Sequence, residues 1–268
     1  MKDYCLELAS RQTGFNAKLN IMREYLQAYT LRIMHEEGVF RSTAFLGGTA
    51  LRFLYGLPRF SEDLDFSIVH KASGAHGFAG LVKKIKEELN LAGYYVSVAY
   101  NDEKTLQHAF IKFEGLMHEA GISPLKSQKF SIKLEIDTNP PDGAVLKTDI
   151  VNKYFPLAFL SYDLESLFAG KLHALLCRNY TKGRDFFDLA WYLSKWKELT
   201  PNFILLANAL RQTKWKGKFP AKDTWRSQIK KVVNKTDWNL VGNDVENFLE
   251  NQTDLSVFTK ENALGLLT

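Results

Sequence analysis

The sequence of 268 residues contains only two cysteines, Cys5 and Cys177. They lie far apart, and neither has a second cysteine or a histidine at the spacing of a metal site. The sequence therefore supports neither a disulfide framework nor a zinc site, and we expect both thiols to be reduced. The six histidines also show no metal-ligand or catalytic-triad spacing.

Long hydrophobic runs are missing as well. No stretch reaches the roughly 18 uninterrupted apolar residues that a membrane-spanning helix requires, and the N-terminus lacks the basic-then-apolar pattern of a signal sequence. This predicts a cytoplasmic protein without a membrane partner. Hydrophobic residues make up 46% of the chain, which is enough to bury the core of one large domain or of two small ones.

Acidic residues are slightly outnumbered by basic ones. The formal net charge is +5 and the pI is near 9.0, which weakly favours a polyanionic partner, because many proteins without nucleic-acid ligands are equally basic. Three of the basic residues, Arg178, Lys182 and Arg184, crowd one short segment, where they could guide a polyanion or interact with a helix end.

Two adjacent glycines predict a sharp turn between a short strand and a helix. We expect Ala44 to Leu46 to form the strand and Thr49 to be the N-cap of a helix that Gly56 ends. Glycines before a helix N-terminus let a phosphate approach backbone N–H groups, so Gly47 and Gly48 are candidate phosphate ligands. A Gly-Gly turn alone is usually only a turn, so this assignment depends on its context.

The next predicted strand carries two carboxylates. Because side chains alternate along a strand, Asp63 and Asp65 should point to one face while Leu64 and Phe66 point to the other. Two bare carboxylates this close repel each other, and either protonation or a bound cation relieves the repulsion. A hard oxygen site of this kind suits Mg²⁺ held jointly with substrate phosphates, so the turn and the carboxylates together indicate a nucleoside triphosphate site.

Further elements follow from hydrophobic spacing. We predict helices at Asn16 to Glu37 and Phe78 to Leu91, a loop at Gly74 to Gly77, strands at Tyr94 to Tyr100, Gln107 to Phe113 and Phe130 to Thr138, and helices at Asp163 to Cys177, Phe203 to Leu210, Ala221 to Asn234 and Trp238 to Leu249. Strand alternation is expected to stop after about Phe155, which places a domain boundary between residues 1–155 and 156–268.

Two residues of the second half have special settings. Lys171 interrupts the apolar stripe of its helix. A lysine in such a position often has no binding role and simply extends its ammonium group to solvent at the edge of the stripe. Trp215 lies among Lys214, Lys216 and Lys218 and is a candidate for stacking on a nucleic-acid base, although a tryptophan is more often a packing residue.

The chain resembles the nucleotidyltransferase superfamily, and most closely the AbiEii/AbiGii-type toxin family. The matching residues are Gly47 to Arg52, Tyr55 with Gly56, and Arg59 to Phe66. In the second half, Lys171 and the stretch Arg184 to Leu189 match a lysine and an Arg-Asp-x-x-Asp-Leu pattern of the same family.

The resemblance implies an α+β fold of the polymerase-β-like nucleotidyltransferase type, with a mixed sheet, flanking helices, a helical C-terminal domain and a cleft between the two. The implied reaction transfers a nucleoside monophosphate from a nucleoside triphosphate to an acceptor and needs Mg²⁺ or Mn²⁺. Asp63 and Asp65 would hold the metal. Glu135 or Asp137, on the polar face of the strand from Phe130, would be the third ligand. The alternative is that this polar face is simply exposed to solvent and has no metal role.

Other site residues are also implied by the resemblance. Gly47, Gly48, Thr49, Arg52 and Lys171 would bind the nucleotide. Asp185 would face the same cleft as Lys171 and has a catalytic role in this assignment. The acceptor's hydroxyl proton would pass to one of three carboxylates, which are Asp185, Glu135 and Asp137, and the sequence leaves open which.

Related toxins modify tRNA and are restrained by an antitoxin encoded beside them, so the resemblance implies an RNA acceptor and a toxin role in a bacterial toxin–antitoxin or phage-defence system. One alternative is a nucleotidyltransferase that modifies a small molecule such as an antibiotic, which an acidic acceptor pocket would favour. The other is a non-catalytic nucleotide-binding or RNA-binding module, against which the complete set of Asp63, Asp65 and Lys171 argues.

Overall fold

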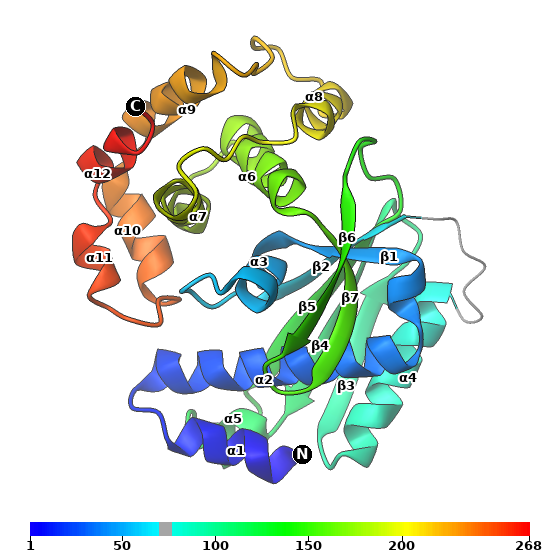
Figure 1. Ribbon diagram of the computed structural model, residues 1–268. Helices are drawn as coiled ribbons and strands as arrows, with labels where there is room; N and C mark the ends of the chain where they lie inside the picture. The colour runs from blue at the N-terminus through cyan, green and yellow to red at the C-terminus, as the bar shows by residue number, and fades with distance from the viewer. Residues whose placement is uncertain (70–76) are drawn as a thin grey trace. The chain divides into compact units, whose positions relative to one another are not determined.

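The structure, a computed structural model, describes residues 1–69 and 77–268 (Figure 1). It divides into two compact units. The sheet unit comprises Met1–Gly56, Phe60–Asn139 and Thr148–Ser161, and the helical unit comprises Leu57–Arg59, Pro140–Lys147 and Tyr162–Thr268. The loop predicted from Gly74 lies, except for Gly77, outside the described residues.

The sheet has seven strands in the described residues, in the order β3-β4-β5-β2-β1-β7-β6. They are β1 (Thr43–Leu46), β2 (Asp63–Ile68), β3 (Tyr95–Asn101), β4 (Leu106–Glu114), β5 (Phe130–Asp137), β6 (Leu146–Asn152) and β7 (Pro156–Tyr162). Strand β2 is antiparallel to β1 and parallel to β5, while β1 is parallel to β7. The predicted mixed sheet is therefore confirmed, and the strand with the two aspartates lies in its middle.

Helices flank this sheet. They are α1 (Lys2–Ser10), α2 (Phe15–Glu36), the short 3₁₀ helix η1 (Val39–Arg41), α3 (Gly47–Tyr55), α4 (Gly77–Leu91) and α5 (Leu116–Glu119). Helix α2 packs on β5 and α4 on β3 and β4, and the two helices also contact each other. A cluster of phenylalanines fills the core around β1, with ring centroids 5.1 Å apart for Phe45 and Phe66 and 5.0 Å apart for Phe40 and Phe159.

The helical unit is built from α6 (Leu164–Cys177), α7 (Gly183–Lys195), α8 (Phe203–Gln212), α9 (Trp225–Lys235), α10 (Trp238–Glu246), α11 (Asp254–Val257) and α12 (Lys260–Gly265). Phe168 of α6 lies at its centre, with its ring 4.6 Å from that of Tyr192 and 5.6 Å from that of Trp225. Asp163 caps α6 by accepting a hydrogen bond from the Ser166 backbone N–H at 2.8 Å. The predicted helices of the second half are confirmed.

One prediction about the chain after Phe155 was wrong. Strand alternation does not stop there, because β7 runs from Pro156 to Tyr162 and pairs with β1 inside the sheet. Its buried residues Leu157 and Phe159 do alternate with more exposed neighbours. A short apolar run of this kind cannot be told from a helical segment by periodicity alone. Strand β6, at the sheet edge, was not predicted either.

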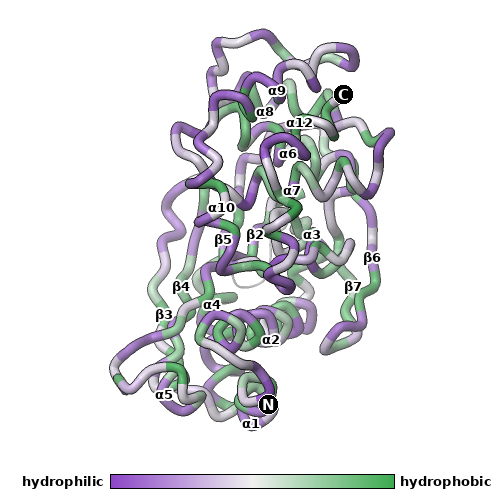
Figure 2. Tube along the Cα trace, turned by 90° about the vertical axis from the view of Figure 1, so that its left-hand side faces the viewer, coloured by the Kyte–Doolittle hydropathy of each residue, from purple (hydrophilic) through white to green (hydrophobic). Residues whose placement is uncertain are grey.

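None of the helices in the described part of the chain is both long enough and apolar enough to span a bilayer. Figure 2 shows hydrophilic and hydrophobic residues interleaved along the elements.

A buried carboxylate joins α2 to α3 and to the end of β6. Glu24 is 2% exposed and forms an ion pair with Arg52, which is 4% exposed. Lys153 Nζ lies 2.8 Å from Glu24 Oε2, and Tyr154 donates its hydroxyl hydrogen to Glu24 Oε1 at 2.8 Å. Burial alone would raise the pKa of Glu24, but the charges of Arg52 and Lys153 outweigh it and hold that pKa below its ordinary value of 4.5.

We expect Glu24→Gln to lower the free energy of unfolding by about 3 kcal/mol, because it leaves the Arg52 cation buried without its anion. Glu36→Gln is the control, since Glu36 pairs with Arg32 on the exposed surface of the same helix and should change stability by less than about 1 kcal/mol. Urea unfolding followed by circular dichroism measures both.

The effect should depend on pH. Because the folded-state pKa of Glu24 is depressed, its stabilisation is present above the ordinary pKa and is lost as the pH falls through the folded value. The difference in unfolding free energy between wild type and Glu24→Gln should therefore become smaller at acidic pH. A Glu24→Gln variant as stable as Glu36→Gln at neutral pH would contradict the role of this network.

Candidate active site

The glycine turn and one of the aspartates are in direct contact. Gly47 is the first residue of α3 and has φ +80°, a conformation that L side chains rarely adopt. A Cβ atom at this position would lie 2.2 Å from Oδ2 of Asp65 and 3.0 Å from its Cβ. Only glycine fits here without displacing the Asp65 carboxylate.

The predicted cap of α3 was wrong. The N-cap is Leu46, and α3 begins at Gly47, two residues before Thr49. Thr49 is fully buried, and its hydroxyl donates a hydrogen bond to the backbone carbonyl of Asp63, which fixes the start of β2 against the helix. A phosphate role for Gly47, Gly48 and Thr49 stays a prediction and, at Thr49, would use the backbone. Gly56, with φ +71°, ends the helix as predicted.

The predicted alternation along β2 is confirmed. Leu64 and Phe66 are buried, while Asp63 and Asp65 are partly exposed on the opposite face. Strand β5 lies parallel to β2, and its register places Lys133 opposite Asp63, Glu135 opposite Asp65, and Asp137 opposite Ser67. The face that carries the two aspartates therefore continues onto β5.

Lys133 is a feature of this face that the sequence analysis did not single out. Its Nζ lies 2.7 Å from Glu135 Oε1. Burial by itself lowers the pKa of Lys133, but the charges of Glu135, Asp63 and Asp65 outweigh it and raise the pKa. The alternation of β5 already placed Lys133 on the acidic face, which was the available signal.

The donor set of this face fits a metal that takes its remaining ligands from substrate and water. In residues 1–69 and 77–268 no group of three His, Cys, Asp or Glu side chains is arranged to hold a metal ion. Glu135 is paired with Lys133, and Asp137 accepts a hydrogen bond from the Asn139 backbone N–H at 2.9 Å. Asp63 and Asp65 offer two hard oxygen donors on this face, which is the protein contribution that Mg²⁺ commonly uses.

Arg52 does not extend toward the turn as a free cation. Its guanidinium is buried in the ion pair with Glu24 and lies 4.0 Å from the centroid of the Phe60 ring. These contacts account for Arg52 as a structural residue. Its predicted nucleotide contact would require breaking a buried ion pair, which typically costs several kcal/mol.

In the helical unit, Lys171 and Asp185 belong to a chain of buried ion pairs. Asp188, fully buried, accepts two hydrogen bonds from Arg59 at 2.6 Å each, and Lys171 Nζ lies 2.6 Å from its Oδ2. Lys171 Nζ is also 3.2 Å from Asp185 Oδ1, and Arg178 Nε is 3.1 Å from Asp185 Oδ2. The structure thus brings Lys171 and Asp185 together, as the family resemblance implies.

The pKa shifts follow from these pairs. Burial by itself would lower the pKa of Lys171 and raise that of Asp188. The neighbouring carboxylates outweigh burial at Lys171 and raise its pKa, and the neighbouring cations outweigh burial at Asp188 and lower its pKa. Both groups are therefore charged in the folded protein. Arg59 and Asp188 match the family pattern but were given no role from the sequence. The i, i+3 spacing of Asp185 and Asp188 on one helix was the signal that these two carboxylates act together.

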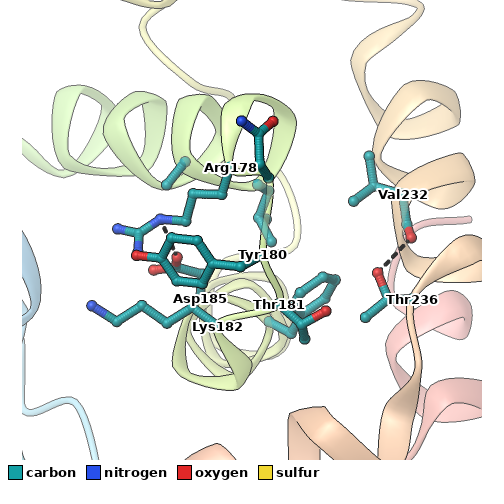
Figure 3. Close-up of a pocket in the computed structure, with 11 residues that line it drawn as sticks. Arg178, Tyr180, Thr181, Lys182, Asp185, Val232 and Thr236 are labelled. Carbon is teal, nitrogen blue, oxygen red and sulfur yellow. Dashed lines mark hydrogen bonds and ion pairs between the residues drawn. The ribbon is translucent and has the colours of Figure 1, made fainter.

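A pocket of about 150 Å³ opens beside the chain of ion pairs, at Arg178 and Asp185 (Figure 3). Its lining includes Arg178, Tyr180, Lys182, Asp185 and Thr236. Arg178 also donates a hydrogen bond to the Tyr180 hydroxyl at 2.7 Å. Burial and the neighbouring cations, Arg184 foremost, lower the pKa of Lys182, so this lysine lies in a locally positive field.

Arg184, the third member of the predicted basic segment, has other contacts. Its Nε lies 3.5 Å from Asp244 Oδ2, and its guanidinium is 4.0 Å from the centroid of the Phe248 ring. The pocket therefore receives two of the three predicted cations, Arg178 and Lys182.

Comparisons with known proteins agree with the fold and show the family. Residues 31–256 match the model of a family described as nucleotidyl transferase AbiEii toxin, type IV toxin–antitoxin system. Among solved structures, a provisionally assigned nucleotidyltransferase from Helicobacter pylori is similar with a TM-score of 0.56 and 19% identity, over 92% of this chain and 91% of that one. The protein JHP933 from Helicobacter pylori has a TM-score of 0.50 and 22% identity, over 91% of this chain and 87% of that one. No curated protein matches the sequence.

Gly47→Ala tests the contact between turn and carboxylate, with Gly56→Ala as control. Both substitutions put a side chain at positive φ, but a Cβ at Gly56 meets nothing within 4 Å. We expect Gly56→Ala to cost about 1 kcal/mol of unfolding free energy and Gly47→Ala roughly 3 kcal/mol. In an Asp65→Ala background the two costs should approach each other. Equal costs in the wild-type background would show that Gly47 and Asp65 do not touch.

Lys171 and Lys182 should respond in opposite directions to removal of their charge. Lys171→Met leaves the buried Asp188 with one cation fewer and should lower the free energy of unfolding by about 3 kcal/mol. Lys182→Met removes a cation from a positive field and should leave stability unchanged or raise it. Chemical denaturation of the two variants side by side measures this, and a stable Lys171→Met protein would contradict the ion-pair chain.

Proposed function

The chain belongs to the AbiEii nucleotidyltransferase toxin family, and we propose that it transfers a nucleoside monophosphate from a nucleoside triphosphate to an RNA acceptor with Mg²⁺ as its metal. It is thus a nucleotidyltransferase of a type IV toxin–antitoxin family. The family model gives the general activity, and the identity of the metal, the nucleotide substrate and the acceptor is our proposal.

The contact of Gly47 with the Asp65 carboxylate carries the proposal. The contact places the N-terminus of helix α3 next to a pair of carboxylates. The helix N-terminus favours a bound anion, and the carboxylates favour a bound cation. A magnesium–triphosphate complex combines both charges in one ligand. Asp63 and Asp65 would hold the ion, and the backbone at Gly47 and Gly48 would accept the phosphates.

The proposed chemistry is an in-line displacement at the α-phosphorus. The acceptor hydroxyl oxygen forms a bond to the α-phosphorus, the bond from that phosphorus to the bridging oxygen breaks, and pyrophosphate leaves with the electron pair. The hydroxyl proton passes to a carboxylate, for which Asp185, Glu135 and Asp137 stay the candidates. Mg²⁺, when bound, supplies charge stabilisation at the phosphoryl oxygens.

The charge of the described pocket supports a polyanionic acceptor. Arg178 and Lys182 line it with one carboxylate, Asp185, which leaves a positive balance. An aminoglycoside-like acceptor, which is cationic, would need the reverse balance. We therefore propose tRNA or another RNA rather than a small molecule. Since nucleoside triphosphates and tRNA are cytoplasmic molecules, the proposal also places the enzyme there.

The family implies an antitoxin partner in general. We propose that a cognate antitoxin protein accompanies this enzyme. The further roles that the resemblance gives to Lys171 and Asp185, in nucleotide binding and catalysis, stay predictions.

Label transfer from each α-labelled nucleoside triphosphate to total tRNA tests the proposal. Wild type should label RNA with one or more of the nucleotides, and Asp63→Asn and Asp65→Asn should each lose about a thousandfold in rate, because each removes a metal ligand. Both variants should remain folded, since loss of one of two like charges relieves repulsion.

Asp102→Asn, in an exposed segment of the same unit, removes the same charge and should retain full activity. Wild-type rates in either Asp63→Asn or Asp65→Asn would refute the assignment of the metal ligands. Transfer to a small cationic acceptor but not to RNA would favour the small-molecule alternative, and binding of nucleotide without any transfer would favour the non-catalytic one.

A further inference from the structure

The positive charge of the chain is concentrated in one short segment of the helical unit. Residues 211–222, here called the basic loop, contain five basic residues and no acidic one. The chain has 35 basic and 30 acidic residues in total, so the rest of the sequence is formally neutral. The five are Arg211, Lys214, Lys216, Lys218 and Lys222.

The basic loop begins with a strained helix end. Lys214 N–H donates to the Arg211 carbonyl at 3.0 Å, and Trp215 N–H donates to the Leu210 carbonyl at 2.9 Å, which is the Schellman pattern that closes α8. Lys214 takes the left-handed position of this motif with φ +57°, and it is the one non-glycine residue with positive φ in the described chain. Glycine adopts this conformation without strain, so a lysine here sacrifices stability.

Trp215 is held in place within the basic loop. Its Nε1 donates to the Lys218 carbonyl at 3.4 Å, and Gly217 lies so close that a Cβ there would come within 2.5 Å of the indole Cζ2. The side chain nevertheless remains partly exposed. An aromatic ring with a fixed orientation loses little entropy when a planar ligand stacks on it.

The lysines around this ring are available to a ligand. Lys214, Lys216 and Lys218 are exposed, and within the described residues none of them forms an ion pair. They alternate along the chain on both sides of Trp215. An ordered aromatic ring among unpaired cations is the arrangement with which proteins bind single-stranded nucleic acid, through base stacking and phosphate contacts.

We propose that the basic loop binds a single-stranded segment of the RNA acceptor, with one base on Trp215 and phosphates on Lys214, Lys216 and Lys218. This inference rests on the proposed function in one respect, the class of the acceptor. The strain at Lys214 supports it, because residues kept in costly conformations concentrate at functional sites. An acidic protein partner would use the lysines but would not need the ring.

Fluorescence anisotropy with a labelled single-stranded 12-nucleotide RNA, without nucleotide or metal, tests the proposal. The logarithm of the affinity should fall linearly with the logarithm of the salt concentration. Each lysine contact contributes about 0.7 to this slope, so Lys214→Gln, Lys216→Gln and Lys218→Gln combined should reduce it by about two units.

The matched control removes three lysines of α4, by Lys83→Gln, Lys84→Gln and Lys86→Gln. Two of these lysines pair with glutamates on the same helix. The control should keep the wild-type slope. An equal reduction in both triple variants would show that only net charge matters and would overturn the proposal.

Three single variants, at Trp215 and Lys214, separate binding from folding. Trp215→Ala should weaken RNA binding about tenfold at nearly unchanged salt slope, and Trp215→Phe should restore most of the loss, because it keeps an aromatic face. Lys214→Gly should raise the melting temperature, because it relieves the strain, and should weaken RNA binding. A Lys214→Gly protein that binds RNA like wild type would count against the proposal.

The outcomes also distinguish this proposal from the proposed function. If wild type labels RNA but the triple variant of the basic loop binds and labels equally well, the loop assignment fails and the enzyme assignment stands. If the loop binds RNA as described but no nucleotide is transferred, the reverse holds. A labelled polyglutamate peptide that depends on the loop lysines as strongly as the RNA does, with no effect of Trp215→Ala on RNA binding, would assign the loop to an acidic protein instead.

Discussion

The candidate site depends on the absence of a side chain at position 47. Because Gly47 has none, α3 can begin directly against the Asp65 carboxylate, and Thr49 of the same helix can bind the carbonyl of Asp63. Both aspartates are then fixed relative to the helix N-terminus by short contacts on one side and by the sheet on the other. The chemistry proposed for the protein follows from this placement, since a cation on the carboxylates and an anion at the helix start are complementary.

Each unit also buries a carboxylate that is held by two cations. Glu24 is paired with Arg52 and Lys153 in the sheet unit, and Asp188 with Arg59 and Lys171 in the helical unit. Buried pairs of this kind are costly to break, because removal of one partner leaves the other charge buried without compensation. Arg59 belongs to the helical unit and precedes Asp63 by only four residues. The ion pair of Arg59 with Asp188 therefore fixes the chain just before it enters β2, the strand with the two candidate metal ligands.

Much of this arrangement could be predicted from the sequence because it depends on local patterns. Alternation predicted the faces of β2 and β5, and glycine positions predicted the turn and the end of α3. Local patterns were insufficient where long-range pairing decides: β7 is a strand because β1 pairs with it, and Arg52 forms a buried ion pair because Glu24, far away in the sequence, meets it in the core. The effect of Asp63 and Asp65 on Lys133 likewise depends on the register of two strands, which no local pattern contains.

The most direct test of the account is the linkage between metal and nucleotide. Isothermal titration of the wild-type protein with a nucleoside triphosphate analogue that has a non-cleavable α–β bridge, in Mg²⁺ and in EDTA, measures it. If Asp63 and Asp65 hold an ion that the triphosphate shares, the analogue should bind at least about tenfold more tightly in Mg²⁺, and by reciprocity Mg²⁺ should bind more tightly by the same factor when the analogue is present. Equal affinity in Mg²⁺ and in EDTA would contradict a metal site shared by the two aspartates and the triphosphate.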